Sequence, residues 1–370
     1  MKRIVLSGYY GFNNAGDEAV LYAIINSLRK LDEKVEITVL SNNPEQTSKL
    51  YNVQAANRWK FNEIIKTIKN SDLLISGGGS LLQDVTSTNG ILYYLGIILF
   101  AKLLNKPVLV YSQGIGPVNI MRNRKLTAFT LNRANAITVR DASSKTDLEQ
   151  MGVKKEIIVS ADPVLGISSS EINIAKGREL LERVDVNINN GKIAGISVRP
   201  WKTDETNFKA LAEACDRLAL DGWQVVFIPM HFPEDIQASR EVVKHMKEKA
   251  FILKENYTPS DTLSIYKAVD MVIGMRLHAL IMAAVVEKPL ISISYDPKVD
   301  RFMNLLGINE VLNINSLKSR EILDLVQNTW ENRSSFVENL QDRLLDLQKR
   351  AIQSAEKALE ILKTRGPKNA

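Results

Sequence analysis

The sequence predicts an α/β protein built from two Rossmann-like domains. Short apolar runs that end in glycine or polar residues alternate with helical patterns along all 370 residues, as in parallel sheets with helical crossovers. The chain is also too long for one ordinary hydrophobic core. In addition, residues 71–83 resemble residues 269–281, and each segment is followed by a Lys-Pro pair and an apolar run. We therefore expect two similar domains that face each other across a cleft.

The predicted elements follow one another in a regular order. In the first half the expected strands are 2–8, 35–41, 72–79, 107–116, 136–141 and 156–163. The polar stretch 168–191 contains no buried strand and is the predicted junction. In the second half the expected strands are 192–200, 223–230, 250–256, 270–276 and 289–297. Residues 335–363 have the apolar spacing of an amphipathic helix. The expected domains are therefore 1–170 and 190–334, with a helix in 335–370 packed back on the body.

Composition excludes several classes of protein. A hydrophobic content of 45% and a charged content of 24% are typical of a soluble globular chain. The single cysteine, Cys215, excludes an intramolecular disulfide and a thiolate metal cluster, and we expect it to be buried. The first residues run directly into a strand without a signal peptide, and the apolar stretch 91–104 is too short to span a bilayer. These features predict a cytoplasmic protein. The net charge of +6 favours anionic partners, but no motif indicates nucleic acid.

The loop after the first predicted strand, residues 8–18, is the first candidate site. Aromatic rings and side-chain amides at the carboxyl end of a strand suit the apolar faces and hydroxyls of a sugar. We therefore expect Tyr10 and Asn14 to contact an acceptor. Asp17 lies where a helix begins, and an acidic side chain there also suits the helix dipole and caps free amides. A purely structural role for Asp17 stays open.

Two further candidates end neighbouring strands in the first half. The glycine-rich turn 76–84 leads into a helix, so backbone amides around Gly78 are suited to cradle an anion. The turn lacks the Gly-Lys-Ser/Thr of a Walker loop. Arg140 lies at the end of the run 136–141. It either lines the same edge or forms a salt bridge with Asp141 or another carboxylate.

The second half contains the strongest group of candidates. Arg199 ends a strand before a proline, Arg276 follows the strand at 270–274, and Lys298 follows the next strand. Three cations on one edge predict a multivalent anion site. His278 is either a packed core histidine or a proton donor beside that anion. A helix start favours neutral imidazole, whereas a bound phosphate and carboxylate favour the protonated form. The three histidines share no ligand spacing, so no metal is expected.

Five segments together resemble the polysaccharide pyruvyl transferase family: "GYYGFNNAGDEA", "DLLISGGGSLLQD", "YSQGIGP", "VRD" and "GMRLHALIMAA". The resemblance covers most of the chain. It implies a glycosyltransferase-B-like fold and transfer of a pyruvyl group from phosphoenolpyruvate to two sugar hydroxyls as a cyclic ketal, without a metal or cofactor. It also implies phosphoenolpyruvate binding by Arg199, Arg276 and Lys298, with His278 as the acid.

Within that family the sequence resembles the ketal pyruvyltransferases of bacterial secondary cell-wall polymers. This similarity implies an N-acetylmannosamine acceptor in a cytoplasmic, lipid-diphosphate-linked disaccharide, and a polymer that anchors surface-layer proteins. The basic net charge and such an acceptor predict weak, salt-sensitive contact with the inner face of the membrane.

Two other functions fit the same architecture. Many nucleotide-sugar glycosyltransferases of this architecture hold the ribose with a carboxylate in the helix before the strand that begins here at Pro289. Residues 279–286 contain none, and the first carboxylate is Glu287. A non-catalytic glycan-binding protein would leave Arg276 and His278 unexplained.

Overall fold

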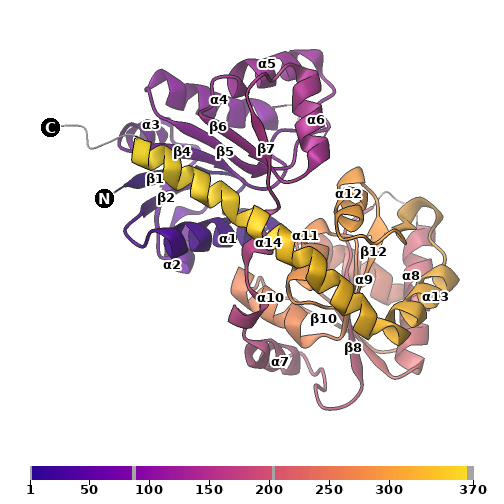
Figure 1. Cartoon of the computed structure of the whole chain (residues 1–370). Coiled ribbons are helices and arrows are strands. Elements are labelled where there is room, and N and C mark those ends of the chain that lie inside the picture. Colours follow the sequence, from indigo (N-terminus) through magenta and orange to yellow (C-terminus); the bar gives the residue numbers. More distant parts are fainter. Residues whose placement is uncertain (1, 86–88, 202–204, 365–370) are drawn as a thin grey trace. The chain divides into compact units, whose positions relative to one another are not determined.

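The computed structural model describes residues 2–85, 89–201 and 205–364. The chain divides into two compact units, each with its own sheet (Figure 1). The first unit comprises Met1–Phe12, Asp17–Gly166 and Leu347–Ala370, and the second comprises Asn13–Gly16 and Ile167–Asp346. The predicted fold class, α/β with two Rossmann-like domains, is confirmed.

The sheet of the first unit has seven parallel strands in the order β3-β2-β1-β4-β5-β6-β7. The strand order changes direction at β1, and open α/β sheets bind ligands outside the carboxyl ends of the strands at such a point. The strands are β1 (Arg3–Ser7), β2 (Glu36–Ser41), β3 (Gln54–Asn57), β4 (Leu73–Gly77), β5 (Val108–Gln113), β6 (Ala136–Val139) and β7 (Ile157–Val159).

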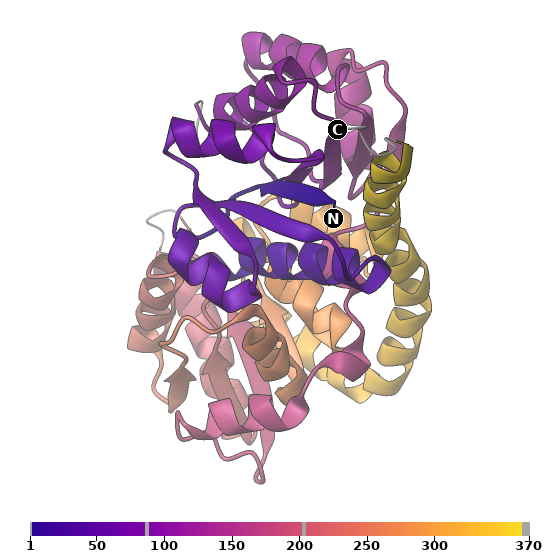
Figure 2. The ribbon, with the colours of Figure 1, turned by 90° about the vertical axis from the view of Figure 1, so that its left-hand side faces the viewer.

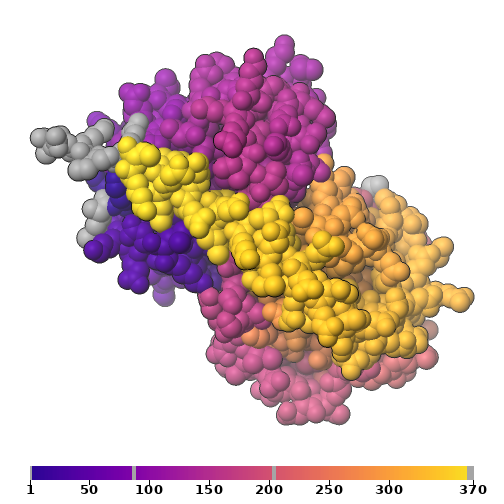
Figure 3. Space-filling model, in the orientation of Figure 1, coloured from indigo at the N-terminus to yellow at the C-terminus, as the bar shows by residue number. Residues whose placement is uncertain are grey.

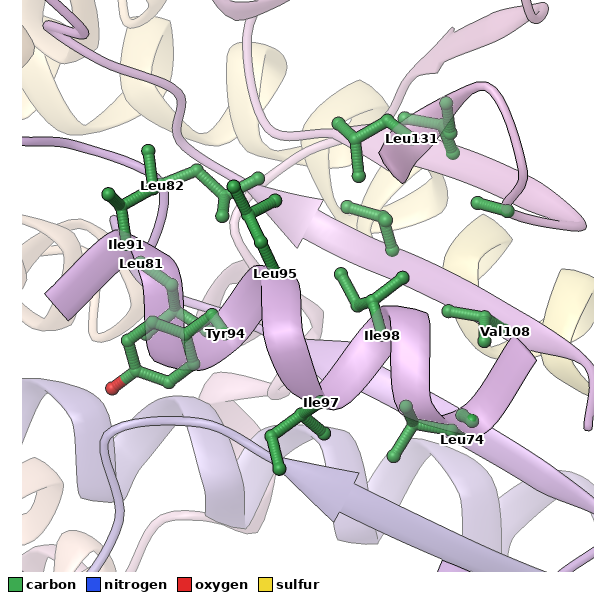
Figure 4. Packing of buried hydrophobic residues seen from close by; sticks show 14 of the residues in the cluster. Leu74, Leu81, Leu82, Ile91, Tyr94, Leu95, Ile97, Ile98, Val108 and Leu131 are labelled. Atoms are coloured by element: carbon green, nitrogen blue, oxygen red, sulfur yellow. The ribbon is translucent and has the colours of Figure 1, made fainter. Parts of the chain in front are cut away.

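Helices cover both faces of this sheet. Buried residues of α3 (Phe61–Lys69), α4 (Gly90–Leu103), α5 (Met121–Leu131) and α6 (Ala142–Met151) join the central strands in one apolar cluster. Figure 4 shows Ile91, Leu95 and Ile98 of α4 in this cluster with Leu74 and Val108 of the strands beneath. On the other face lie α1 (Ala15–Leu31) and α2 (Pro44–Tyr51), as Figure 2 shows from the side.

The second unit repeats this design with a six-stranded parallel sheet in the order β10-β9-β8-β11-β12-β13. Its strands are β8 (Lys192–Ser197), β9 (Trp223–Phe227), β10 (Ala250–Ile252), β11 (Met271–Gly274), β12 (Leu290–Ser294) and β13 (Leu312–Asn313). Its helices are α7 (Ile174–Glu182), α8 (Glu205–Leu220), α9 (Glu234–His245), α10 (Pro259–Ala268), α11 (Leu277–Val285), α12 (Pro297–Leu305) and α13 (Ser319–Glu331).

The C-terminal helix α14 (Arg333–Thr364) contributes residues to both units. Its buried residues recur every three or four positions, as the predicted amphipathic pattern requires: Leu340, Leu344, Leu347, Ala351, Ala355, Ala358 and Leu362. In the first unit the Ser354 hydroxyl forms hydrogen bonds with the Thr138 hydroxyl at 2.7 Å and the Ser112 hydroxyl at 2.8 Å. The opposite side of the helix lies on the molecular surface (Figure 3).

The sequence misses two strands, β3 and β13. Their sequences, "QAAN" and "LN", are short and contain polar residues, so they lack the apolar run by which the other strands are found. Cys215 is fully buried in α8 as expected, and burial raises the pKa of its thiol. Within the described ranges, no helix is both long and apolar enough to cross a membrane.

Candidate functional site

The predicted cations of the second unit lie at the carboxyl ends of three adjacent strands. β8, β11 and β12 are neighbours in the sheet and run parallel. Arg199 is two residues past β8, Arg276 two residues past β11, and Lys298 four residues past β12. Because parallel strands end at the same edge, the topology brings these three residues to one rim.

An aromatic ring joins two of these cations. The guanidinium carbon of Arg199 lies 4.3 Å from the centre of the Tyr295 ring, and Lys298 Nζ lies 5.4 Å from the same centre. Trp201 packs against Tyr295 with 5.4 Å between ring centroids. Lys298 also pairs with Asp296 at 3.3 Å. Stacking orients a guanidinium through its face, so its N–H groups stay available in the plane.

Arg276 is fixed by a buried carboxylate. Its Nε donates to Asp235 Oδ2 at 2.9 Å and its Nη2 donates to Oδ1, which makes the pair bidentate. Asp235 is completely buried and also accepts the backbone N–H groups of Met230 and His231, at 3.1 and 3.0 Å. Asp235 thus holds one edge of the planar fork. Within the described part of the chain, Nη1 on the other edge donates no hydrogen bond.

His278 lies directly against the backbone of Gly16. A Cβ built on Gly16 would lie 2.4 Å from His278 Nδ1 and 2.7 Å from Cγ, closer than atoms approach in packed proteins. Any larger side chain at this position would therefore force the imidazole to shift. His278 is the second residue of α11, and Arg276 is the N-cap of that helix. The contact joins the two sequence motifs that pointed most strongly to function.

The residues around the start of α1 pair with the loop after β9. The Ala15 N–H donates to the Met230 carbonyl at 2.7 Å, and Asn14 forms an isolated antiparallel bridge with His231. The side-chain oxygen of Asn14 accepts the Gly16 N–H at 3.0 Å. Asn14 thereby caps the helix start and helps to hold Gly16 in place.

His231 is a half-buried imidazole close to both arginines. Burial lowers its pKa, and Arg276 and Arg199 lower it further, while Glu234 and Asp235 oppose them. Its Nδ1 lies 3.6 Å from Glu234 Oε2. At pH 7 the neutral ring therefore predominates, with one nitrogen that donates and one that accepts.

In the first unit, Tyr10 has a structural role instead of the predicted contact with an acceptor. It is 1% exposed, and its hydroxyl donates to the Gly77 carbonyl at 3.0 Å. Burial raises the pKa of Tyr10 well above its usual value, and the charges of Asp17 and Glu18 raise it further. The neutral phenol thus stabilises the glycine-rich turn through its hydrogen bond to the Gly77 carbonyl.

The glycines of that turn serve close packing against α1. Gly78 has φ +63°, and a Cβ there would lie 1.8 Å from Val20 Cγ1. Gly79 has φ +67°, and its Cβ would lie 2.6 Å from the Asp17 carboxylate. The Gly78 N–H donates to the Tyr111 carbonyl at 3.0 Å, so it does not serve the predicted anion cradle. Asp17 lies against the turn.

Asp84 ends the same motif and holds the loop before α5. It accepts the backbone N–H groups of Asn119 and Ile120 at 2.8 and 3.0 Å, and the Asn123 side-chain amide at 3.0 Å. Burial raises the pKa of Asp84, but these hydrogen bonds outweigh it and hold the pKa below its usual value. Asp84 is therefore a structural carboxylate.

Arg140 combines both roles that were left open for it. Its side chain is 8% exposed and pairs with Asp162 at 3.5 Å and Asp141 at 3.6 Å. Its Nη2 donates to the Ser80 hydroxyl at 3.1 Å, and a Cβ on Gly114 would meet the guanidinium at 2.5 Å. Arg140 thus connects the carboxyl ends of several strands of the first sheet.

Sequence reasoning missed Arg58, a buried cation surrounded by aromatic rings. Its guanidinium carbon lies 4.4 Å from the ring centre of Tyr93, 5.0 Å from that of Phe12 and 5.2 Å from that of Trp59. The guanidinium also donates to the Gly8 carbonyl at 2.5 Å. Trp59, just past β3, is 63% exposed. An exposed indole held this way suits the apolar face of a sugar.

The polysaccharide pyruvyl transferase family model matches residues 14–297, which include Arg199, Arg276 and His278 and end one residue before Lys298. The chain belongs to the polysaccharide pyruvyl transferase family. It is therefore a pyruvyltransferase of polysaccharide biosynthesis. The amylovoran biosynthesis protein AmsJ of Erwinia amylovora is 21% identical over an alignment that covers 89% of this chain and 92% of that protein.

Solved structures show the fold of this pyruvyl transferase. Anabaena HepE in complex with UDP-glucose superposes with a TM-score of 0.67 at 12% identity, covering 99% of this chain and 100% of that one. A putative UDP-N-acetylglucosamine 2-epimerase from Listeria monocytogenes gives a TM-score of 0.68 at 12% identity, covering 100% and 98%. These similarities support the predicted glycosyltransferase-B-like pair of Rossmann-like domains.

Three further residues contact or lie close to the candidate cations and were not predicted from the sequence for this role: Asp235, Tyr295 and His231. Each follows a strand of the second sheet, so position at a carboxyl end was the signal available for all three. His231 was weighed only as a metal ligand. In the described residues, no group of three or more His, Cys, Asp or Glu side chains is placed to hold a metal ion.

Proposed function

We propose that this enzyme takes its pyruvyl group from phosphoenolpyruvate and joins it to two hydroxyls of a sugar as a cyclic ketal. The convergence of Arg199, Arg276 and Lys298 on one edge of three adjacent strands carries the proposal. Phosphoenolpyruvate has a carboxylate and a phosphate, and planar guanidinium groups match both geometrically. Three fixed cations suit this small trianion.

In the proposed reaction, His278 donates a proton to the methylene carbon of phosphoenolpyruvate, which becomes a methyl group. The first sugar hydroxyl attacks the adjacent carbon. The bond from that carbon to the phosphate oxygen then breaks. Phosphate departs, and an oxocarbenium ion remains. The second hydroxyl attacks this ion and closes the ketal. One of the two hydroxyl protons restores His278 and the other leaves on phosphate, so atoms and charge balance.

The contacts around each cation give it a distinct task in this proposal. Asp235 holds Arg276 before substrate arrives, so little reorganisation is needed on binding. Tyr295 orients Arg199 through its ring face. Neutral His231, close to both arginines, supplies a hydrogen bond without adding charge. Gly16 sets the distance at which His278 meets the donor.

We further propose that the acceptor is a lipid-diphosphate-linked disaccharide, with N-acetylmannosamine as the sugar that receives the ketal. Membership of the polysaccharide family and the likeness to AmsJ, a protein of amylovoran biosynthesis, support an acceptor from polysaccharide assembly. The exposed Trp59 ring supports sugar recognition. We place the reaction in the cytoplasm, at the inner face of the membrane.

One observation concerns the alternative, a nucleotide-sugar glycosyltransferase. HepE binds UDP-glucose on a similar fold, but a fold does not carry a function with it. Helix α11 contains no carboxylate along its length from Leu277 to Val285. Glu287 follows the helix, and its carboxylate accepts a hydrogen bond from Gln341 at 2.5 Å. The ribose ligand expected of such an enzyme is therefore missing from this helix.

Proton transfer in deuterated water tests the proposal directly. A product whose new methyl group carries one deuterium is expected, because the third hydrogen comes from solvent through His278. His278→Gln should lower kcat by about 10²–10⁴-fold while the affinity for phosphoenolpyruvate changes far less. Near-normal kcat with an unchanged acidic limb of the pH profile would contradict the role of His278.

Ligand-dependent melting separates the candidate functions. Phosphoenolpyruvate alone should raise the melting temperature, and Arg199→Gln should reduce that increase, because Arg199 makes few internal hydrogen bonds and its loss leaves the fold intact. Lys318→Gln, at a residue 71% exposed on α13's N-terminal side, is the matched charge control. Stabilisation by UDP and not by phosphoenolpyruvate would favour the glycosyltransferase.

A further inference from the structure

The positive charge of this chain is concentrated in one segment. Residues 85–140 contain seven of the 48 Lys and Arg residues and none of the 42 Asp and Glu residues. The remainder of the chain, with 41 basic and 42 acidic residues, is nearly neutral. The segment runs from the end of the glycine-rich motif to Arg140 and includes α4 and α5. Arg140 is buried and paired with Asp141 and Asp162, so the other six cations carry the local excess of positive charge in the first unit.

The outward face of α4 is apolar where a surface helix is normally polar. Ile91, Leu95 and Ile98 pack inward on the sheet (Figure 4). On the other side, Leu103 is 79% exposed, and a Cβ built on Gly96 would meet nothing within 4 Å. Lys102 is the single charged residue of this helix. The helix thus presents hydrocarbon to solvent.

The outward face of α5 alternates apolar and basic side chains. Met121 is 63% exposed and Phe129 is 49% exposed. Arg122 and Lys125 are exposed three residues apart on α5, and Arg133 is exposed just after the helix ends. The guanidinium carbon of Arg133 lies 3.5 Å from the centre of the Phe129 ring. No carboxylate neutralises this stripe from within the segment.

The two helices form one continuous surface. They are successive crossovers of the same sheet and belong to the same apolar cluster, and they lie side by side in Figure 1. Lys102 Nζ donates to Asn135 Oδ1 at 2.9 Å, which ties the end of α4 to the residues after α5. We call this surface the α4–α5 face and define it by Leu103, Met121, Arg122, Lys125 and Phe129.

We propose that the α4–α5 face docks on an anionic phospholipid bilayer. Exposed hydrocarbon enters the acyl boundary of a bilayer, while lysine and arginine beside it pair with anionic headgroups. A second copy of the chain would place basic rows against basic rows, which repel each other. A nucleic acid would use the cations and leave the protruding Leu103 and Met121 without a partner. Of these three partners, an anionic membrane alone matches both the exposed apolar side chains and the cations beside them.

Co-sedimentation with vesicles tests this surface independently of the donor and acceptor. The wild-type chain should bind vesicles of phosphatidylglycerol and phosphatidylcholine in equal parts at 0.1 M salt, where the Debye length is about 10 Å. Binding should weaken at 1 M salt and with phosphatidylcholine alone. Neutralising two cations with Arg122→Gln and Lys125→Gln should lower the partition coefficient about 30-fold, or about 1 kcal/mol for each cation.

A second variant tests the apolar half of the face. Leu103→Ser, Met121→Ser and Phe129→Ser together should lower the partition coefficient about 100-fold. This corresponds to about 1 kcal/mol for each side chain that is partly buried in the bilayer. The residual binding should depend on salt more steeply than that of the wild type, because only electrostatic attraction is left. Melting curves of both variants show whether the fold is kept.

Matched controls alter equal numbers of exposed residues elsewhere. Lys318→Gln with Arg320→Gln removes two cations whose side chains are 71% and 90% exposed. Leu31→Ser, Leu220→Ser and Leu345→Ser removes apolar side chains that are 41%, 64% and 60% exposed. Both controls should bind vesicles like the wild type.

Three results would overturn the proposal. The first is no binding to anionic vesicles at low salt. The second is equal loss in the controls and in the α4–α5 variants, which would make the binding a general property of net charge. The third is a self-associating chain, shown by sedimentation velocity, that becomes monomeric in the α4–α5 variants and never binds lipid.

Discussion

Replacement of Gly16 by alanine should separate catalysis from binding. The added Cβ would lie 2.4 Å from His278 Nδ1 and 2.7 Å from Cγ, whereas carbon and nitrogen in contact lie about 3.5 Å apart. The imidazole must therefore move by about 1 Å. Misplacement of a catalytic group by about 1 Å costs about 10²-fold in rate. We expect kcat to fall by that factor.

The same substitution should leave most other properties unchanged. Gly16 lies in the first turn of α1, where alanine is the better helix former by up to about 1 kcal/mol. Overpacking against His278 costs about 1–3 kcal/mol, so the net loss of stability is expected to be about 0–2 kcal/mol. Phosphoenolpyruvate affinity should change little, because Arg199, Arg276 and Lys298 do not touch Gly16.

The assay is phosphate release at saturating donor and acceptor, with titration calorimetry for phosphoenolpyruvate and thermal melting for stability. Gly96→Ala is the matched control, since a Cβ there meets nothing within 4 Å. A Gly16→Ala enzyme with wild-type kcat would refute the reasoning, since His278 would then tolerate displacement. Loss of donor affinity equal to the loss of kcat would show instead that the whole rim had moved.

Three other substitutions have effects set by local contacts. Asp84→Asn should lower the free energy of unfolding by about 1–3 kcal/mol, because a carboxylate that accepts three hydrogen bonds loses its charge. The pKa of Asp84 is lowered in the folded state, so its stabilising contribution is complete above the unfolded-state pKa and is lost as the pH falls through the folded-state pKa. Urea titrations below about pH 4 should therefore show a smaller acid-induced loss of stability in the variant than in the wild type. Arg276→Ala should lower the free energy of unfolding by about 3–5 kcal/mol, because the buried Asp235 carboxylate loses its cationic partner. Adding Asp235→Asn should restore part of this stability. Equal stability of the single and double variants would contradict the ion pair's role. Gly78→Ala should lower the melting temperature markedly, because of its φ of +63° and the 1.8 Å approach to Val20, and an unchanged melting curve would show that the turn relaxes freely.

Most of the predicted fold follows from local features of the sequence. The alternation of apolar runs and helical patterns is set by residues a few positions apart, and it identified most strands and the long C-terminal helix. The same logic placed Arg199, Arg276 and Lys298 at the carboxyl ends of adjacent strands, because a residue just past a strand lies at that edge wherever the strand pairs. β3 and β13 escaped because their short sequences carry too little apolar signal.

The partner of each side chain depended on tertiary structure. Tyr10 and Arg276 both lie in motifs that suggest a functional site. In the structure the Tyr10 hydroxyl donates a hydrogen bond to the Gly77 carbonyl, and the Arg276 guanidinium donates to the Asp235 carboxylate. Strand order and helix packing decide such pairings between residues distant in sequence, and no local pattern records them. The sequence by itself determined the family and which cations lie at the carboxyl edge of the second sheet. Only the tertiary structure decided that His278 rests on Gly16, because that contact exists only once both segments are folded against each other.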